Sequence, residues 1–171
     1  RDWLKPVVEQ KLGGKIVFGR VMMKPSKPTT FVTLPKGKFI FALPGNPASA
    51  LVAFHMFAAP AIRKLAGHVI NVSAKDSVVG ALRPSVKAHF VGEPLSLDRV
   101  RPEFMRGCLE WKRESGKWTV TATDRRQQSS RMASMQSANA LIALPIGTAD
   151  KAAVSDNELV DVIVIGSVSF A

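Results

Sequence analysis

The sequence has little cysteine, no long apolar run and few acidic residues. Its single cysteine, Cys108, excludes an internal disulfide and fits a reducing compartment, which favours the cytoplasm. The three histidines are isolated and no Cys-x-x-Cys pair occurs, so a Cys/His metal site is not expected. Because no apolar run approaches the ~18 residues that a membrane-spanning helix needs, no such span is predicted. No signal peptide is recognisable.

Acidic residues number 13 against 24 Lys and Arg, which gives a net charge of +11 and a pI near 10.3. Such a surplus attracts anions, whether nucleic acid, phosphate-bearing small molecules or inorganic oxyanions. The positive residues are dispersed rather than gathered in a tail, which argues against a disordered arm that binds nucleic acid. With 171 residues, 46% of them hydrophobic, the chain can form one ordinary domain or two small ones.

The pattern of the chain changes near residue 69. Residues 1–68 predict an α/β unit, and residues 69–171 predict a β-barrel-like subdomain built from short β runs. The first unit is expected to contain a helix ending near Leu12, strands at 15–23, 30–34 and 38–43, and a helix from Pro47 to about Leu65 that Pro60 kinks or splits. Strands in the second are expected at 69–73, 86–91, 108–113, 118–123, 140–144 and 159–165. The first residue is not Met and no strand precedes the first helix, so we expect a fragment of a longer protein.

The turn 43–49, Leu-Pro-Gly-Asn-Pro-Ala-Ser, joins a predicted strand to the long helix. Asn46 suits the N-cap, where its side-chain oxygen would accept from free backbone N–H groups, and Pro47 suits the first helical position. Those N–H groups and the helix dipole favour an anion, with Ser49 beside them. Taken alone, the turn is more typical of an ordinary, well-capped strand–helix connection than of an anion site.

Two proline-flanked cationic segments and one polar loop are further candidates for an anion site. Residues 24–28, Lys-Pro-Ser-Lys-Pro, form a stiff elbow with two ammonium groups, and in residues 100–106 Arg101 stands beside Pro102. Arg101 can offer forked N–H donors to an oxyanion, or it can form a surface salt bridge with Glu103. The loop 125–139 is rich in hydroxyl groups, and loops of that length are often functional.

Together these segments resemble the molybdenum insertases, namely the bacterial MoeA type and the E domains of eukaryotic gephyrin and its plant counterpart. The resemblance rests on four blocks in the family's order: Lys24-Pro25-x-Lys27-Pro28-x-Thr30-Phe31, Leu43-Pro44-Gly45-Asn46-Pro47-x-Ser49, Arg101-Pro102-Glu103-Phe104, and Ser129-Ser130-Arg131-x-x-Ser134-Met135-x-Ser137-Ala138-Asn139. It covers nearly the whole chain. It implies a partial three-layer MogA-like α/β domain, followed by the β-barrel-like subdomain.

The resemblance also implies an activity: a molybdopterin molybdenumtransferase inserts molybdate into adenylylated molybdopterin and releases AMP, which is a step of molybdenum cofactor biosynthesis. Members of the family use Mg²⁺ and act as homodimers, and some are fused to a molybdopterin adenylyltransferase domain that binds ATP. Neither DNA nor a membrane is an expected partner. A chain that carries only part of the family's sequence is expected to hold part of the active site.

The family's functional residues fall on positions in each of these blocks. By resemblance, the molybdate site comprises Lys24, Lys27, Pro28, Arg101 and Ser129. The side that holds the phosphate and pterin comprises Gly45, Asn46 and Ser49. Asp2 matches a family acid associated with the nucleotide and, here, with the metal; Asp2, Lys24 and Lys27 are the expected catalytic residues. Molybdate is a tetrahedral dianion, so cations and hydroxyl donors rather than carboxylates are expected around it.

Three departures from the family are visible, and two other functions stay open. Ser26 replaces a common glycine in the elbow, Gln136 stands where many relatives have arginine, and the basic pair 125–126 precedes Gln127. The net charge and the β-rich second half also suit a basic nucleic-acid-binding module, although no strip of basic and aromatic residues is evident. A receptor-anchoring scaffold of the gephyrin kind is the remaining alternative.

Overall fold

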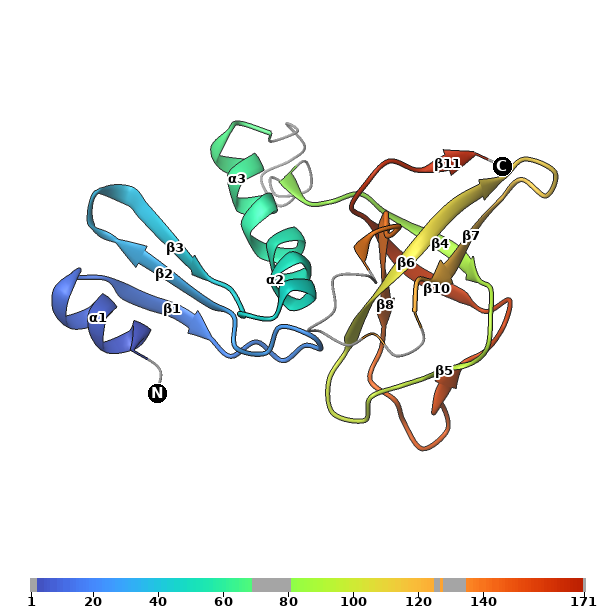
Figure 1. Ribbon diagram of the computed structural model, residues 1–171, viewed down its shortest axis with the longest axis horizontal. Helices are drawn as coiled ribbons and strands as arrows, with labels where there is room; N and C mark the ends of the chain where they lie inside the picture. Colours follow the sequence, from blue (N-terminus) through green and yellow to red (C-terminus); the bar gives the residue numbers. More distant parts are fainter. Residues whose placement is uncertain (1–2, 69–80, 125–126, 128–134, 171) are drawn as a thin grey trace.

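The computed structural model describes residues 3–68, 81–124, 127 and 135–170. Figure 1 shows an α/β half and a β half, with the helices that follow Pro47 between the small sheet and the barrel. The predicted class, an α/β unit followed by a β-barrel-like unit, is confirmed. No helix among the described residues is long and apolar enough to cross a membrane.

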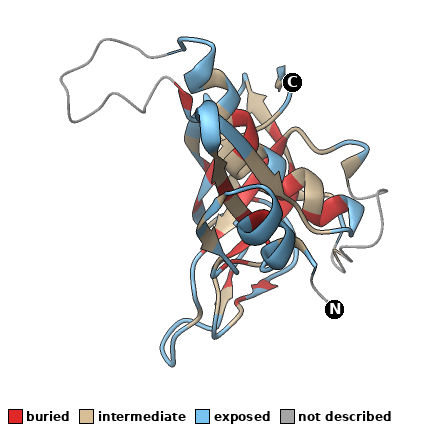
Figure 2. Ribbon diagram, turned by 90° about the vertical axis from the view of Figure 1, so that its left-hand side faces the viewer, coloured by how far each residue is buried: buried red, intermediate tan, exposed pale blue. Residues whose placement is uncertain are grey.

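The α/β half begins with helix α1 (Leu4–Lys11), which packs on a three-stranded antiparallel sheet. Gly13 takes a positive φ of 60° and Gly14 donates its N–H to the carbonyl of Val8, so the two glycines end the helix as predicted. Val8 is the buried residue of α1, while most of the helix is exposed (Figure 2). A side chain at Gly14 would press on Leu34 and Val8, so glycine allows this close packing.

The sheet runs in the order β1 (Lys15–Gly19), β2 (Thr30–Leu34) and β3 (Lys38–Ala42). The strands β2 and β3 match the prediction closely. The first strand is shorter than the predicted 15–23, because Arg20 turns the chain with a φ of 64° and the proline-rich elbow follows. The Phe31 ring stacks on Phe41 and makes a tilted contact with Phe18, which also contacts Phe57 of the following helix.

The long helix consists of α2 (Pro47–Ala53), a π-helical turn (Phe54–Ala58) and α3 (Ala59–Leu65). Pro60 lies in the first turn of α3, so the predicted kink or split occurs at the proline. Because proline has no N–H to donate to the preceding turn, the hydrogen-bond register widens just before it. The turn before α2 places Asn46 at the N-cap and Pro47 at the first position, as predicted, but Asn46 makes no side-chain capping bond.

The β half is a closed barrel of five strands. These are β4 (Ser85–Phe90), β6 (Glu103–Lys112), β7 (Lys117–Ala122), β8 (Ala140–Leu144) and β10 (Leu159–Val164). The long strand β6 closes the ring because its first half pairs with β8 and its second half with β7. At the changeover Gly107 faces Ile142 and the Thr121 carbonyl so closely that a Cβ atom would lie about 3.0 Å from both.

Three further strands were not predicted, since each is only two residues long: β5 (Leu95–Ser96), β9 (Ala153–Val154) and β11 (Ser169–Phe170). β11 adds to β6 in parallel, and β5 pairs with β9. The predicted strand 69–73 lies outside the described residues. Alternate residues of the barrel strands point inward and form its core: Ala88, Phe90, Leu109, Val120, Ala140, Ile142 and Val162.

The two halves meet in a smaller apolar cluster. Three buried residues form it: Met23 just before the elbow, Val52 from α2 and Leu141 from β8, with Phe57 and Phe104 packed against them. The start of the elbow is therefore held by apolar contacts that both halves share. This packing places the elbow and the start of α2 against the mouth of the barrel (Figure 1).

Candidate anion-binding site

A pocket of about 310 Å³ lies where the elbow, the turn before α2 and the start of β6 meet. Its lining comprises Lys24, Pro25, Ser26, Lys27, Pro28, Pro44, Asn46, Ser49, Arg101, Glu103, Arg106 and Gln127. Three of the four sequence blocks that carried the resemblance thus contribute to one cavity. Of the predicted site residues, Gly45 is described and exposed but does not line the cavity. Asp2 and Ser129 lie outside the described residues.

Backbone hydrogen bonds hold the elbow against β6. The N–H of Lys24 donates to the carbonyl of Pro102 at 2.9 Å, and the N–H of Phe104 donates to the carbonyl of Lys24 at 2.7 Å. The two segments form an isolated parallel bridge between Lys24 and Glu103. Residues far apart in the sequence therefore face one cavity because of strand-like pairing, which no local sequence pattern predicts.

Ser26 in the elbow has a strained backbone conformation, which its own side chain helps to stabilise. The Lys24–Pro25 peptide bond is cis, and Ser26 adopts a φ of 82°, in the left-handed region that glycine favours. The Ser26 hydroxyl, which is buried, donates to the carbonyl of Ser49 at 2.7 Å. Serine thus keeps the backbone shape that a glycine would adopt, and it ties the elbow to the first turn of α2.

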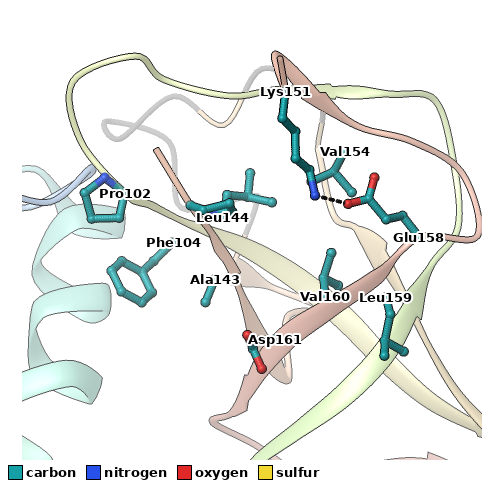
Figure 3. A pocket seen from close by; sticks show the side chains of 11 residues that line it. Pro102, Phe104, Ala143, Leu144, Lys151, Val154, Glu158, Leu159, Val160 and Asp161 are labelled. Carbon is teal, nitrogen blue, oxygen red and sulfur yellow. Dashed lines mark hydrogen bonds and ion pairs between the residues drawn. The ribbon is translucent and has the colours of Figure 1, made fainter. Parts of the chain in front are cut away.

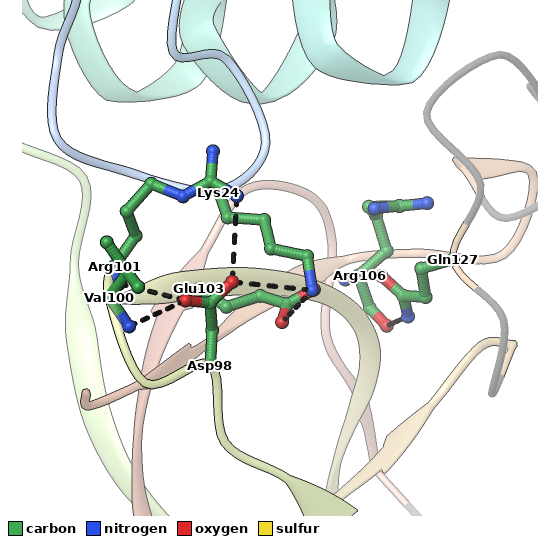
Figure 4. A network of polar contacts seen from close by, with 7 residues as sticks. All are labelled: Lys24, Asp98, Val100, Arg101, Glu103, Arg106 and Gln127. Carbon is green, nitrogen blue, oxygen red and sulfur yellow. Dashed lines mark hydrogen bonds and ion pairs between the residues drawn. The ribbon is translucent and has the colours of Figure 1, made fainter. Parts of the chain in front are cut away.

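Two carboxylates also belong to this site, contrary to the expectation that it would exclude them. Lys24 lies 2.9 Å from a Glu103 oxygen and 3.9 Å from an Asp98 oxygen, and the Arg101 guanidinium lies 3.6 Å from Asp98 (Figure 4). Among the described ion pairs Arg101 contacts Asp98, so the alternative of an Arg101–Glu103 salt bridge is not observed. By contrast, Lys27 is exposed and forms no ion pair with a described carboxylate.

The carboxylate of Asp98 is ionised in this environment. It accepts the N–H groups of Val100 and Arg101, and these two hydrogen bonds hold its pKa below the ordinary value, against a smaller opposing effect of desolvation. The charges of Arg101 and Lys24 lower the pKa further. Asp98 therefore stays negative throughout the neutral range and does not compete with a ligand for protons.

A buried arginine forms the deep wall of the pocket. The Arg106 side chain is 1% exposed, and the loss of water lowers its pKa, while the charges of Glu103 and Asp124 raise it. Guanidinium keeps its proton at any pH a protein tolerates, so Arg106 remains cationic. The Gln127 amide accepts from the Arg106 N–H and donates to the Arg106 carbonyl, both at 2.6 Å. The sequence analysis did not assign Arg106 or Gln127 to the site, because neither residue lies within the four motif blocks.

The described residues do not fit a magnesium ion. No group of three or more His, Cys, Asp or Glu side chains among them could hold a metal. Glu103, which lines the pocket, and Asp98, which lies beside it, are both engaged by Lys24 or Arg101. Asp2, the acid expected at a metal, is outside the described residues, so we derive no chemical step through Mg²⁺.

A second cavity of about 410 Å³ opens on the side of the barrel (Figure 3). Its walls are mainly apolar, with Phe104, Leu144 and Val160 among them, and the ion pair Lys151–Glu158 lies at its rim. None of the described residues predicted for the anion site lines it. Its only lysine is already paired, so this cavity suits an oxyanion less well than the first.

Comparisons with known proteins indicate the family of this chain. Residues 1–64 match the family model described as a probable molybdopterin binding domain, and residues 91–165 match the MoeA C-terminal region, domain IV. The chain is 35% identical to gephyrin of Dictyostelium discoideum, over 84% of this chain and 21% of that protein. It is 39% identical to the molybdenum cofactor synthesis protein cinnamon of Drosophila melanogaster, over 88% and 23%.

A molybdopterin molybdenumtransferase of Nostoc is 30% identical, over 80% of this chain and 29% of that enzyme. The chain thus spans less than a third of the length of these relatives. A solved molybdopterin biosynthesis MoeA protein of Pyrococcus horikoshii shares the fold, with a TM-score of 0.64 at 19% identity over 95% of this chain and 34% of that one. The chain belongs to the molybdenum insertase family of MoeA and gephyrin, and it carries the family's C-terminal part.

Proposed function

We propose that this chain supplies the oxyanion side of a molybdopterin molybdenumtransferase, which inserts molybdate into adenylylated molybdopterin and releases AMP. The observation that carries the proposal is the pocket that Lys24, Lys27, Arg101 and Arg106 share with Ser49. Curated relatives of this chain bear the name molybdopterin molybdenumtransferase, which supports the same reaction.

The chemistry of molybdate suits these side chains. A tetrahedral dianion needs fixed cations and neutral donors in a partly dry cavity, where electrostatic interactions are stronger than in water. Lys27 is the cation of the pocket whose charge is not offset by a described carboxylate, so it is the natural first contact for an incoming anion. Lys24 and Arg101, already anchored by carboxylates, offer their remaining N–H donors from defined positions.

In the proposed reaction the elbow and β6 hold the molybdate while the pterin dithiolate attacks it. As the two sulfurs bond to molybdenum, one oxo oxygen takes up two protons and leaves as water, and the cations of the pocket stabilise the negative charge on the oxygens during this exchange. A second water cleaves the adenylate, which releases AMP. Asn46 and Ser49 also line this pocket. We assign them to the phosphate and pterin side of the proposed site. We extend the proposal to the family's homodimer and a cytoplasmic location, which the single cysteine supports. Asp2, Gly45 and Ser129 keep the roles that the resemblance implies.

Calorimetric titration with molybdate tests the proposal. Wild-type protein should bind molybdate saturably, with sulfate as a competitor. Lys27→Ala should weaken binding about 10- to 100-fold, because a charged hydrogen bond contributes roughly 1.5–3 kcal/mol. The matched control is Lys87→Ala, since Lys87 is an exposed lysine of the barrel that pairs with Asp161.

Other outcomes would redirect the assignment. Equal molybdate affinity in Lys27→Ala and wild type would remove Lys27 from the site. Absence of molybdate binding, together with nucleic-acid binding that weakens steeply with salt, would favour the basic-module alternative. Release of AMP from adenylylated molybdopterin only when molybdate is present would establish the reaction itself.

A further inference from the structure

Asp98 occupies an unusual position beneath the cations of the pocket. One of its oxygens accepts the N–H groups of Val100 at 2.8 Å and of Arg101 at 3.0 Å. The other oxygen faces the Arg101 guanidinium at 3.6 Å and the Lys24 ammonium at 3.9 Å. A single carboxylate thus holds the backbone and the side chain of Arg101 while it also attracts Lys24 (Figure 4).

The surroundings of Asp98 make these contacts effective. Its side chain is only 17% exposed, so water competes little for the carboxylate. Glu103, 12% exposed, holds the same Lys24 ammonium at 2.9 Å. A guanidinium has five N–H donors and an ammonium has three, so each cation can pair with a carboxylate and still direct donors into the cavity.

We propose that Asp98 is a positioning residue, which aims Arg101 and Lys24 at a tetrahedral oxyanion in the pocket. This inference rests on the proposed function for the identity of the anion. A carboxylate near a dianion also repels it, so the two effects of Asp98 on affinity have opposite signs. The geometry points to positioning as the larger effect, because long side chains left free lose much of their ability to form directed bonds.

The substitution Asp98→Asn separates these effects. Asparagine keeps an oxygen that can accept the N–H groups of Val100 and Arg101, and so preserves the turn. It removes the negative charge that holds the guanidinium and the ammonium. We expect molybdate affinity to fall about tenfold in calorimetry, with thermal unfolding near that of wild type.

Each alternative result overturns the proposal. A rise in affinity would show that Asp98 acts mainly by repelling the anion. Unchanged affinity would show that it only shapes the turn. The matched control is Asp156→Asn, since Asp156 is an exposed aspartate that accepts the Gly92 N–H on another part of the barrel. That variant should bind molybdate as wild type does.

A second measurement needs no bound anion. Phenylglyoxal modifies accessible, unanchored arginines, and peptide mass spectrometry gives the rate at each one. Arg101 should react several-fold faster in Asp98→Asn than in wild type, while the exposed neighbour Arg99 serves as an internal reference. Equal rates at Arg101 would refute the anchoring role. If wild type fails to bind molybdate but Arg101 is released by Asp98→Asn, the proposed function fails while the positioning inference stands.

Discussion

At the scale of single residues, the elbow shows how one side chain can support a backbone shape that it does not favour. Ser26 has a positive φ, which costs a non-glycine residue of the order of 1–3 kcal/mol. Its buried hydroxyl offsets part of that cost by donating to Ser49. Serine at this position therefore gives up the conformational freedom of glycine and gains a specific bond between the elbow and α2.

This balance predicts different outcomes for two small substitutions of Ser26. Ser26→Ala keeps the strain and loses the hydrogen bond, so it should lower the free energy of unfolding by about 1 kcal/mol. Ser26→Gly loses the bond but also removes the strain, so it should stay within about 0.5 kcal/mol of wild type. Urea denaturation of both variants measures the difference. Equal losses of stability would show that the positive φ carries no cost.

At the scale of elements, two side-chain amides bond to backbone groups of strand β6 that no neighbouring barrel strand reaches. Strand β6 pairs with β8 only in its first half and with β7 only in its second. The side chain of Gln127 bonds to the backbone of Arg106 on the vacant β7 side, and that of Asn139 bonds to the N–H and carbonyl of Leu109 on the vacant β8 side. These amides satisfy backbone groups that would otherwise lack a partner strand.

A histidine in the helix between the halves is expected to make the stability of the protein depend on pH. His55 lies in the π-helical turn, and its ring nitrogen contacts Arg83 at 3.2 Å. Burial, and then the charge of Arg83, lower the pKa of His55 below the ordinary 6.5. Because the folded state disfavours the protonated ring, His55 should not reduce stability above pH 6.5. The free energy of unfolding should fall as the pH drops below 6.5 toward the pKa that His55 has in the folded state.

A comparison of His55→Gln with wild type isolates this effect. Glutamine can still accept from Arg83 but does not titrate, so the variant should lose less stability than wild type between pH 7 and pH 5. Denaturant titrations at both pH values give, for each protein, the change in the free energy of unfolding with pH. The same slope in both proteins would mean that His55 is not the group responsible.

At the scale of the whole molecule, the site depends on how the two halves pack. Leu141 is completely buried in the barrel wall, where it meets Val52 of α2 and Met23, which directly precedes the elbow. The same contact brings the elbow to β6. Charge is also distributed unevenly along the chain, because no acidic residue occurs between Glu9 and Asp76. The cationic elbow therefore belongs to a stretch in which Lys and Arg are not balanced by any Asp or Glu.

Leu141→Ala therefore tests whether stability and binding are linked. Truncation of a fully buried leucine should lower the free energy of unfolding by about 2–5 kcal/mol. Molybdate affinity should also fall at a temperature where the variant is still folded, because the elbow and β6 would be held less firmly together. Val120→Ala, in the core of the barrel away from the elbow, is the control. Lost stability with intact affinity in Leu141→Ala would separate the two properties.

The prediction from sequence succeeded where the information is local. Strands β2 and β3, the helix stop at Gly13–Gly14 and the interruption at Pro60 follow from periodicity, glycine conformation and the missing N–H of proline. The motif blocks indicated the cations of the pocket for the same reason, since each lies within a short segment. The two-residue strands were missed because such lengths carry no periodicity.

The sequence by itself determined the two-part architecture, the family and the candidate cations. Only the tertiary structure decided that Asp98 and Glu103 stand beside those cations, and that Arg106 and Gln127 form the deep wall. The bridge between Lys24 and Glu103 joins the elbow to the start of β6, and the two come together because α2 and the elbow pack against the barrel. Such long-range contacts depend on the whole fold, so no short segment encodes them.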